Sequence, residues 1–175
     1  MYTPNCKITL SNGKEYTIIN LLGHGKGGYS YLAECDGRQV VFKQIHHEPC
    51  DYYKFGNKIE AERTDYARIK AAGIRIPEMN AIDTETEVIV KDYIPGEHIA
   101  DMIKNGESVD DYIPQVREMA ALAKNAGINI DYYPTNFVVR SGQIWYVDYE
   151  CNDYMEEWDF EHWGIKHWRG RDQLL

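Results

Sequence analysis

The sequence predicts an α+β fold in two parts: a mainly antiparallel β part with one helix, followed by a smaller and mainly helical part. In roughly the first ninety residues, short apolar runs alternate with tight-turn dipeptides. In the second half, apolar residues recur mostly at helical spacing. The dipeptide Pro95-Gly96 separates the two patterns. We therefore expect an N-terminal domain over residues 1–94 and a C-terminal domain over residues 95–175.

Two dipeptides near the start of the chain predict β-hairpins. Asn12-Gly13 and Asp36-Gly37 each lie between two runs of strand-forming residues. Asn or Asp followed by Gly favours a tight hairpin turn, because both turn positions need a positive φ. The four predicted strands are residues 7–10, 14–18, 29–35 and 38–45.

A helix is predicted next, from about residue 55 to just before Gly73. Its apolar stripe recurs at helical spacing, and Pro77 prevents the helix from resuming. The stripe includes the carboxylate of Glu62 among apolar side chains. Its members are Ile59, Glu62, Tyr66 and Ile69. One more strand is predicted over residues 87–93.

The second half is predicted to contain one clear amphipathic helix, which ends near Gly127. Two short strands, residues 136–140 and 143–149, follow and are joined by Ser141-Gly142. The last stretch, residues 154–168, is aromatic and acidic, and we expect it to be helical in part. The stripe of the amphipathic helix consists of Val116, Met119, Ala120 and Ala123.

The composition limits the partners of the chain. Its formal net charge of −9 argues against a general binder of nucleic acids or anionic membranes. No apolar run approaches the ~20 residues of a membrane-spanning helix, and no secretory signal is visible. The four cysteines are scattered, so we expect free thiols and a cytoplasmic protein. His46, His47 and Cys50 lie close in sequence, but they lack a fourth ligand, so we expect no metal there.

Gly23, Gly25 and Gly28 form the pattern G-x-G-x-x-G between two predicted strands. The exposed backbone amides of such a loop can bind phosphate, although a flexible hairpin tip is the simpler alternative. A dinucleotide-binding fold would need a helix after the glycines and an acid about 20 residues later. Here a strand follows and Lys43 stands at that distance, so this fold is excluded.

Lys43 lies inside an apolar strand, where its charge is costly unless an anion pairs with it. Glu62 lies on the apolar stripe of the following helix, so we expect it to pair with Lys43. Two alternatives stay open. Lys43 can instead face solvent on the wet side of its strand, and the neighbouring Glu60 can be the partner of Lys43.

Asp131, Asn136 and Asp148 form the second candidate site. Asp131 and Asn136 are separated by four residues, and Asp148 follows twelve residues after Asn136. Mg²⁺ prefers oxygen ligands, which Asn136 and Asp148 can supply. A carboxylate such as that of Asp131 can orient a hydroxyl and accept its proton. Each of these residues taken alone is more often part of a turn or a solvated loop.

In their order along the chain, these motifs resemble those of the protein-kinase-like superfamily. The glycine-rich loop is followed by V-V-F-K ending at Lys43, D-x-x-x-x-N from Asp131 to Asn136, and V-D-Y-E around Asp148. These segments are similar to the family's V-A-I-K, catalytic loop and D-F-G segment. The resemblance covers about residues 21–165. In its compactness, the chain is most similar to small prokaryotic members of the superfamily that are lipopolysaccharide-kinase-like.

The resemblance implies a two-lobed kinase-like fold with ATP and Mg²⁺ in the cleft between an N-lobe and a reduced helical C-lobe. Lys43, held by Glu62, would bind the nucleotide phosphates together with the glycine-rich loop. The backbone of Asp92 and Ile94 would contact adenine.

The resemblance further assigns Mg²⁺ binding to Asn136 and Asp148, and activation of the acceptor to Asp131. It implies an ATP-dependent phosphotransferase that moves the γ-phosphate of MgATP to a hydroxyl. The acceptor would be a small molecule, a lipid or sugar, or the protein itself. Two alternatives stay open: a pseudokinase that binds nucleotide as a sensor or scaffold, and a kinase-shaped interaction module that binds no nucleotide.

Several positions depart from the family pattern. Asn129-Ile130 replaces the usual His-Arg, Tyr133 replaces a common lysine, and Glu150 replaces the glycine of D-F-G. Too few residues follow this last motif for an activation segment and a peptide-binding platform. Asp159 is similar to the aspartate that braces the family's catalytic loop, although an N-terminal helix cap is the simpler alternative.

Overall fold

The computed structural model describes residues 1–48 and 57–169, and the chain forms two compact units. The first is built around a β-sheet, and the second combines helices with short strands. The predicted α+β class is therefore confirmed. Within the described residues, no helix is both long and apolar enough to cross a membrane. The first unit consists of Met1–Glu62 and Glu78–Tyr93, and the second of Arg63–Pro77 and Ile94–Leu175.

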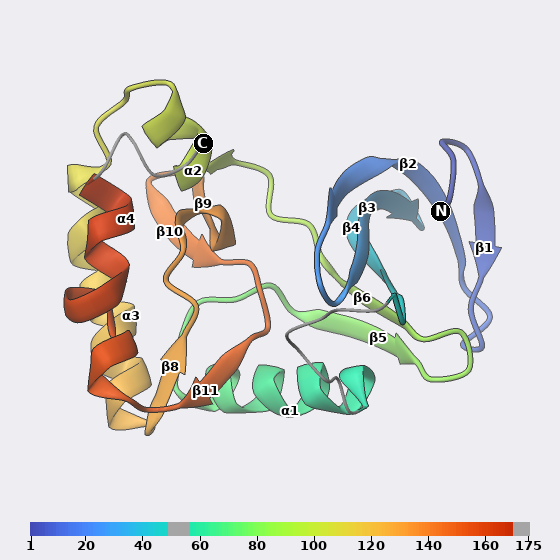
Figure 1. The fold of residues 1–175 in the computed structure, drawn as a ribbon. Helices are drawn as coiled ribbons and strands as arrows, with labels where there is room; N and C mark the ends of the chain where they lie inside the picture. Colours follow the sequence, from blue (N-terminus) through green and yellow to red (C-terminus); the bar gives the residue numbers. More distant parts are fainter. Residues whose placement is uncertain (49–56, 170–175) are drawn as a thin grey trace. The chain divides into compact units, whose positions relative to one another are not determined.

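A curled, six-stranded antiparallel sheet forms most of the first unit (Figure 1). Its strand order is β1-β2-β3-β4-β6-β5, and both predicted hairpins are confirmed as the pairs β1-β2 and β3-β4. The strand β2 continues past its predicted end, and β5 was not predicted. The strands are β1 (Lys7–Thr9), β2 (Glu15–His24), β3 (Gly28–Cys35), β4 (Arg38–Ile45), β5 (Met79–Asp83) and β6 (Val88–Asp92).

The two faces of this sheet have different partners, because side chains alternate along each strand. Phe42 of β4 is fully buried and belongs to the larger core cluster of the unit. Ile45 lies on the opposite face of β4 and packs against Ile59 at the start of α1 (Lys58–Ala71). Lys43 is two residues before Ile45, so its side chain also lies on the face toward α1.

Helix α1 begins at Lys58, and the predicted start near residue 55 lies outside the described residues. The helix ends at Ala71, two residues before Gly73, whose φ is 82°. This left-handed conformation favours glycine and ends the helix, as predicted.

The boundary between the two units differs from the predicted one. Residues 63–77 group with the second unit, whereas a single boundary was predicted from the sequence, after residue 94. The physical reason is a set of contacts that sequence spacing does not show. Arg68 forms an ion pair with Asp153 (2.6 Å), and the Tyr149 hydroxyl donates to Pro77 O (2.6 Å).

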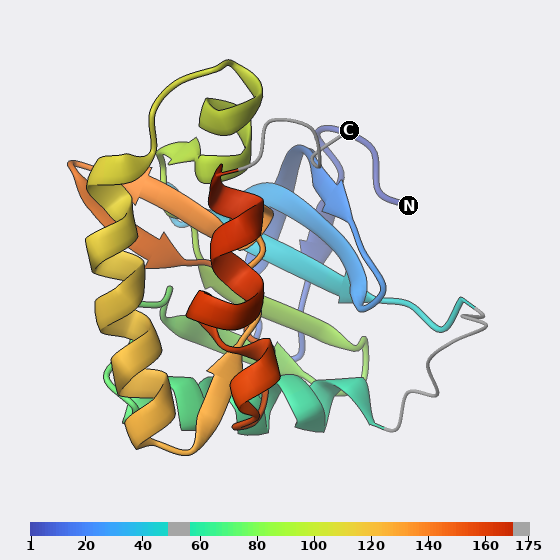
Figure 2. The same cartoon turned by 60° about the vertical axis from the view of Figure 1, so that its left-hand side comes forward.

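The second unit contains two small sheets and several helices. One sheet has the order β10-β9-β7, and the other pairs β11 with β8. In Figures 1 and 2, α3 lies beside the C-terminal helical segment, and Arg117 of α3 pairs with Glu161 there (2.6 Å). The elements are β7 (Glu97–His98), α2 (Ile99–Lys104), α3 (Ile113–Asn125), β8 (Ile128–Ile130), β9 (Phe137–Arg140), β10 (Gln143–Tyr146), β11 (Cys151–Asp153) and α4 (Ile165–Arg169).

Several elements of this unit were predicted, whereas α2 and the shortest strands were missed. The amphipathic helix, the strands β9 and β10, and a partly helical C-terminal stretch are confirmed. The strand predicted to reach residue 149 ends at Tyr146, because its partner β9 begins only at Phe137, after the turn Pro134–Asn136. The strands β7, β8 and β11 have only two or three residues, too few for a periodic pattern.

Candidate functional site

The glycine-rich loop of the first unit connects β2 to β3. It is closed by Gly25 N–H, which donates to Gly28 O (3.0 Å). Position 28 must be glycine, because a Cβ there would lie 2.3 Å from Gln44 O. A Cβ at Gly23 or Gly25 would meet nothing within 4 Å, so their surroundings do not require glycine.

The ion pair predicted between Lys43 and Glu62 is present in the first unit. Only 13% of the Lys43 side chain and 14% of the Glu62 side chain are exposed. Gly27 lies next to this pair, since a Cβ there would lie 3.2 Å from Lys43 Nζ. Gly27 is not one of the three glycines of the G-x-G-x-x-G pattern. A side chain at this position would nevertheless crowd the ammonium of Lys43. Glu60, the alternative partner, is exposed on α1.

A second buried lysine holds the backbone of the glycine-rich loop. Lys58 is only 6% exposed, and its ammonium donates to Lys26 O (3.1 Å) and to His46 O. A buried ammonium needs such acceptors, and it also keeps positive charge beside the loop. Sequence reasoning missed Lys58, because a lysine at the start of a helix is usually solvated.

The two residues expected to contact adenine lie at and beyond the end of β6. Asp92 is exposed, its N–H donates to Glu78 O (2.9 Å), and its Oδ1 accepts a hydrogen bond from Asn80 (2.8 Å). Ile94 is buried and belongs to the second unit. The backbone N–H of Asp92 is therefore already used inside the first unit.

The acidic site of the second unit begins where β8 ends. Asp131 Oδ1 accepts a hydrogen bond from Tyr133 N–H (3.0 Å), a local turn that orients the carboxylate. Asn136 ends the turn Pro134–Asn136, and its Nδ2 donates to Asp131 O (3.3 Å). The D-x-x-x-x-N spacing thus brings these two residues together. The amide nitrogen of Asn136 makes the bond, so its amide oxygen is the atom suited to a metal ion.

Tyr146 connects the two acidic segments of the second unit. Its buried hydroxyl accepts a hydrogen bond from Asp131 N–H (3.3 Å) and donates one to Glu150 O (2.7 Å). Burial first, and then the charges of Asp148 and Asp131, raise the pKa of Tyr146 well above its ordinary value. Both carboxylates are therefore close to one hydroxyl that stays protonated. Sequence reasoning missed Tyr146, because it is indistinguishable there from an apolar strand residue.

Asp148 and Asp65 bring further negative charge to this site. Asp148 Oδ1 accepts a hydrogen bond from Tyr149 N–H (2.8 Å). The pKa of Asp65, a residue of α1, is raised mainly by burial and partly by the charge of Asp148. Hydrogen bonds from Cys151 and the charge of Arg68 act in the opposite direction. Asp65 is three residues after the stripe residue at position 62, and that spacing was the available sequence signal.

The C-terminal helix supports the loop that carries Asp131. Trp168 of α4 is 2% exposed, and its indole N–H donates to Tyr132 O (2.8 Å). Its ring packs edge-on against Phe137 and Phe160. The loop is thus held from α4 through a backbone carbonyl.

Asp159 has the simpler of its two predicted roles. Its Oδ1 accepts hydrogen bonds from His162 N–H (2.9 Å) and from His162 Nδ1 (2.8 Å) at the start of the π-helical turn Phe160–Gly164. Its Oδ2 accepts a hydrogen bond from the Tyr154 hydroxyl (3.2 Å). Asp159 is therefore a helix cap, and these contacts do not include the loop of Asp131.

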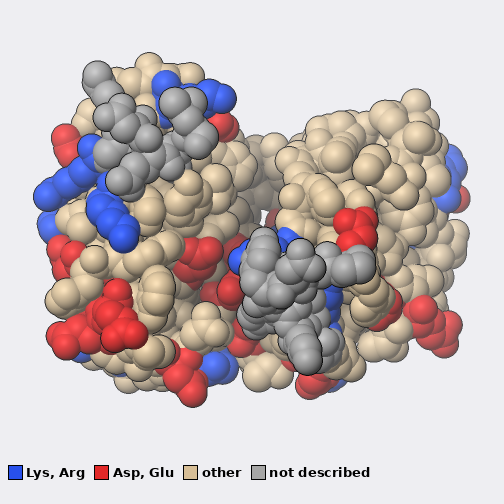
Figure 3. Space-filling model, viewed as in Figure 1, with Lys and Arg blue, Asp and Glu red and all other residues tan. Residues whose placement is uncertain are grey.

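The surface of the second unit is acidic near the end of α3 (Figure 3). Asp153, Glu156 and Glu157 are exposed in the segment that includes β11 and the turn after it. These charges add to the carboxylates of Asp65, Asp131 and Asp148. A concentration of carboxylates of this kind favours cations over anions.

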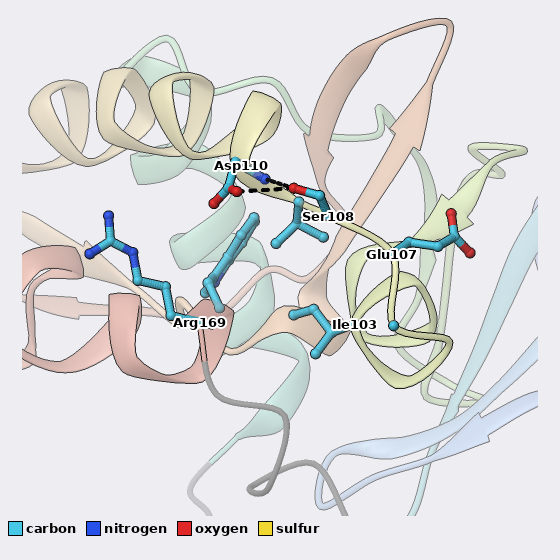
Figure 4. Close-up of a pocket in the computed structure, with 8 residues that line it drawn as sticks. Ile103, Glu107, Ser108, Asp110 and Arg169 are labelled. Carbon is cyan, nitrogen blue, oxygen red and sulfur yellow. Dashed lines mark hydrogen bonds between the residues drawn. The ribbon is translucent and has the colours of Figure 1, made fainter.

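A cavity of about 320 Å³ lies elsewhere in the second unit (Figure 4). It is lined by the end of α2, the segment before α3 and the end of α4. Figure 4 shows Ser108 hydrogen-bonded to Asp110, while the Glu107 side chain points away from the others. None of the predicted site residues lines this cavity, so it is separate from the acidic site.

Comparisons with known proteins do not identify the chain. It matches no protein-family model and no curated protein. The functional interpretation therefore depends on the residues themselves. The first unit offers a buried ammonium beside an open glycine-rich loop, an arrangement suited to phosphate oxygens. The second offers three carboxylates and an amide, an arrangement suited to a divalent cation and a hydroxyl.

Proposed function

We propose that the chain is an ATP-dependent phosphotransferase with a protein-kinase-like fold, which moves the γ-phosphate of MgATP to a hydroxyl acceptor. The observation that carries the proposal is the largely buried pair of Lys43 and Glu62, whose side chains are 13% and 14% exposed, beside Gly27. A buried ion pair contributes little net stability, since desolvation offsets its attraction. A lysine held in this way beside a glycine at position 27 is well placed to bind an anion.

The proposed roles in the first unit concern the phosphates. Lys43 donates hydrogen bonds to phosphate oxygens, and Glu62 fixes the direction of its ammonium. Gly27 leaves space for the phosphate to approach, and Lys58 keeps the loop backbone in place through Lys26 O.

The proposed roles in the second unit concern the metal and the acceptor. Asn136 and Asp148 would hold Mg²⁺, which when bound neutralises charge on the phosphates. Asp131 orients the acceptor hydroxyl and takes its proton as the oxygen attacks the γ-phosphorus. The bond from that phosphorus to the bridging oxygen breaks, and ADP leaves.

A specific observation favours a second candidate function, nucleotide binding without turnover. Tyr133 stands where many kinases place a lysine, and its N–H holds Asp131 Oδ1 (3.0 Å). One positive charge near the transferred phosphate is therefore missing. A pseudokinase that acts as a sensor or scaffold would tolerate this change.

Transfer of radiolabelled phosphate from ATP tests the proposal. The wild type is compared with Asp131→Ala, with Asp148→Asn, and with Asp101→Asn as a control on the exposed side of α2. Loss of the proton acceptor should lower turnover by at least about 10²-fold in Asp131→Ala, with MgATP binding retained. Asp148→Asn should weaken Mg²⁺ binding, and Asp101→Asn should behave as wild type.

Thermal melting with and without MgATP separates the candidate functions. A ligand at ~100 times its Kd stabilises the folded state by ~2.7 kcal/mol, so a nucleotide binder shows a clear rise in Tm. Such a rise without phosphate transfer supports the pseudokinase. No rise at millimolar MgATP contradicts both nucleotide-binding functions, and equal ATP consumption by all variants contradicts the assigned roles.

A further inference from the structure

We propose that His24, His46 and Glu48 bind a divalent transition-metal ion, with Zn²⁺ as the best match, beside the glycine-rich loop of the first unit. One ligand atom from each of these residues lies within 4.8 Å of the other two. None of the three has a role in the proposed phosphotransfer, so this inference is independent of that function.

The two distances from His24 to the other ligand atoms match a tetrahedral site. His24 Nε2 lies 3.2 Å from His46 Nε2 and 3.4 Å from Glu48 Oε2. Tetrahedral Zn²⁺ with bonds of about 2.0–2.1 Å places its ligand atoms ~3.3–3.4 Å apart. Two of the three separations therefore have the required spacing, and the third, between His46 and Glu48, is within 4.8 Å. Water would fill the fourth position.

Neighbouring residues orient two of the ligands. The His24 ring stacks on Tyr29, with ring centroids 4.2 Å apart and planes 4° from parallel. The Tyr29 hydroxyl donates to Glu48 Oε1 (2.5 Å), leaving Oε2 toward His24. His46 follows the end of β4, and its carbonyl accepts a hydrogen bond from Lys58. Such supporting contacts are typical of metal ligands.

Metal binding requires the ring proton of His46 to change position. Its Nδ1 accepts a hydrogen bond from Glu48 N–H (3.2 Å), and its Nε2 lies 2.9 Å from Gly25 O. In the neutral ring the proton therefore lies on Nε2. Metal binding moves this proton to Nδ1 and exchanges the Glu48 N–H bond for a metal–nitrogen bond.

The ligand types select the class of metal. Two imidazoles and one carboxylate suit Zn²⁺, Ni²⁺ or Cu²⁺, whereas Mg²⁺ prefers an all-oxygen shell. His46, His47 and Cys50 lie close in sequence, and no metal was predicted there for lack of a fourth ligand. Cys50 lies outside the described residues, and strand pairing brings in His24, 22 residues before His46.

The test is titration of Zn²⁺, and of Co²⁺ as a visible probe, into the full chain without nucleotide. The variants are His24→Ala and Glu48→Gln, with His47→Ala as a matched control. His47 is a 63% exposed neighbour that contacts Glu87 instead of the cluster. Far-UV circular dichroism checks that each variant is folded.

With excess Mg²⁺ present to occupy the acidic site of the second unit, we expect one bound Zn²⁺ ion per chain. We also expect loss of at least about tenfold in affinity in His24→Ala and Glu48→Gln but not in His47→Ala. The Co²⁺ spectrum should show tetrahedral bands without a thiolate charge-transfer band, and excess Mg²⁺ should not compete. The proposal is overturned by the absence of Zn²⁺ binding at ~1 mM. It is equally overturned by thiolate ligation, by Mg²⁺ competition, or by equal weakening in His47→Ala.

Discussion

Asp83 shows how one side chain fastens separate segments of the first unit. It is 2% exposed, its Oδ2 accepts a hydrogen bond from Ser11 N–H (2.6 Å), and its Oδ1 accepts two more, from Glu85 N–H (3.0 Å) and Thr86 N–H (2.9 Å). The backbone N–H groups of Ser11 and Thr86 hold the pKa of Asp83 well below its ordinary value. The folded state therefore strongly prefers the ionised carboxylate.

This preference predicts how stability depends on pH. Because the pKa of Asp83 is lowered by folding, its contribution is present above the unfolded pKa of ~3.9 and is lost as the pH falls toward the folded pKa. Asp83→Asn should lower the free energy of unfolding by about 1–3 kcal/mol at pH 7, because one oxygen acceptor is lost. Urea unfolding measured from pH 7 to pH 3 should show a shallower acid dependence than in wild type. An unchanged acid dependence would show that Asp83 is not responsible.

Some residue roles could be predicted from the sequence and others could not. Lys43 and Glu62 were predictable, because a charge on an apolar stripe is conspicuous and needs a partner. Lys58, Asp65 and Tyr146 were not, because each is ordinary at its own position. Their roles depend on partners that are far away in sequence, such as Cys151 for Asp65.

At the scale of elements, the β2-β3 hairpin depends on one glycine more than on the others. Gly28 lies opposite Ile45 in the sheet, and its missing side chain lets Gln44 O approach. Gly25 lies in the same loop with open space around its Cα. The two positions therefore form a matched pair for substitution.

We expect Gly28→Ala to destabilise the protein by about 1–3 kcal/mol, because the added Cβ collides with backbone and the strands must shift. Gly25→Ala should change stability by no more than about 0.5 kcal/mol. Chemical denaturation of both variants measures the difference. Equal effects at the two positions would contradict the close approach of Gln44 O to position 28.

Elements were predictable where local geometry defines them. The Asp36-Gly37 turn was found from its sequence, because the φ values of 52° and 73° suit these two residues. The pairing of β8 with β11 could not be found, because three-residue strands carry no pattern. This pairing nevertheless places Asp131 and Glu150 directly beyond paired residues, so a missed element positions a predicted site.

At the scale of the whole molecule, the proposed function requires residues of both units to act on one nucleotide. A double-mutant cycle tests this requirement. Lys43→Met and Asp148→Asn should each reduce the rise in Tm caused by MgATP. The MgATP-induced rise in Tm should fall in the double variant by less than the sum of its decreases in the two single variants, because both changes weaken binding of the same ligand. Loss of the MgATP-induced rise in Tm in one single variant, with an unchanged rise in the other, would contradict a shared nucleotide.

The hydrogen bond from Trp168 to Tyr132 O has a consequence for shortened versions of this chain. A protein that stopped before residue 165 would retain Asp65, Asp131 and Asp148, the three carboxylates of the acidic site. It would lose the Trp168 indole, which donates to Tyr132 O and packs against Phe137 and Phe160. A truncated protein without turnover would therefore be evidence about the support of the loop and not about the chemistry of its carboxylates.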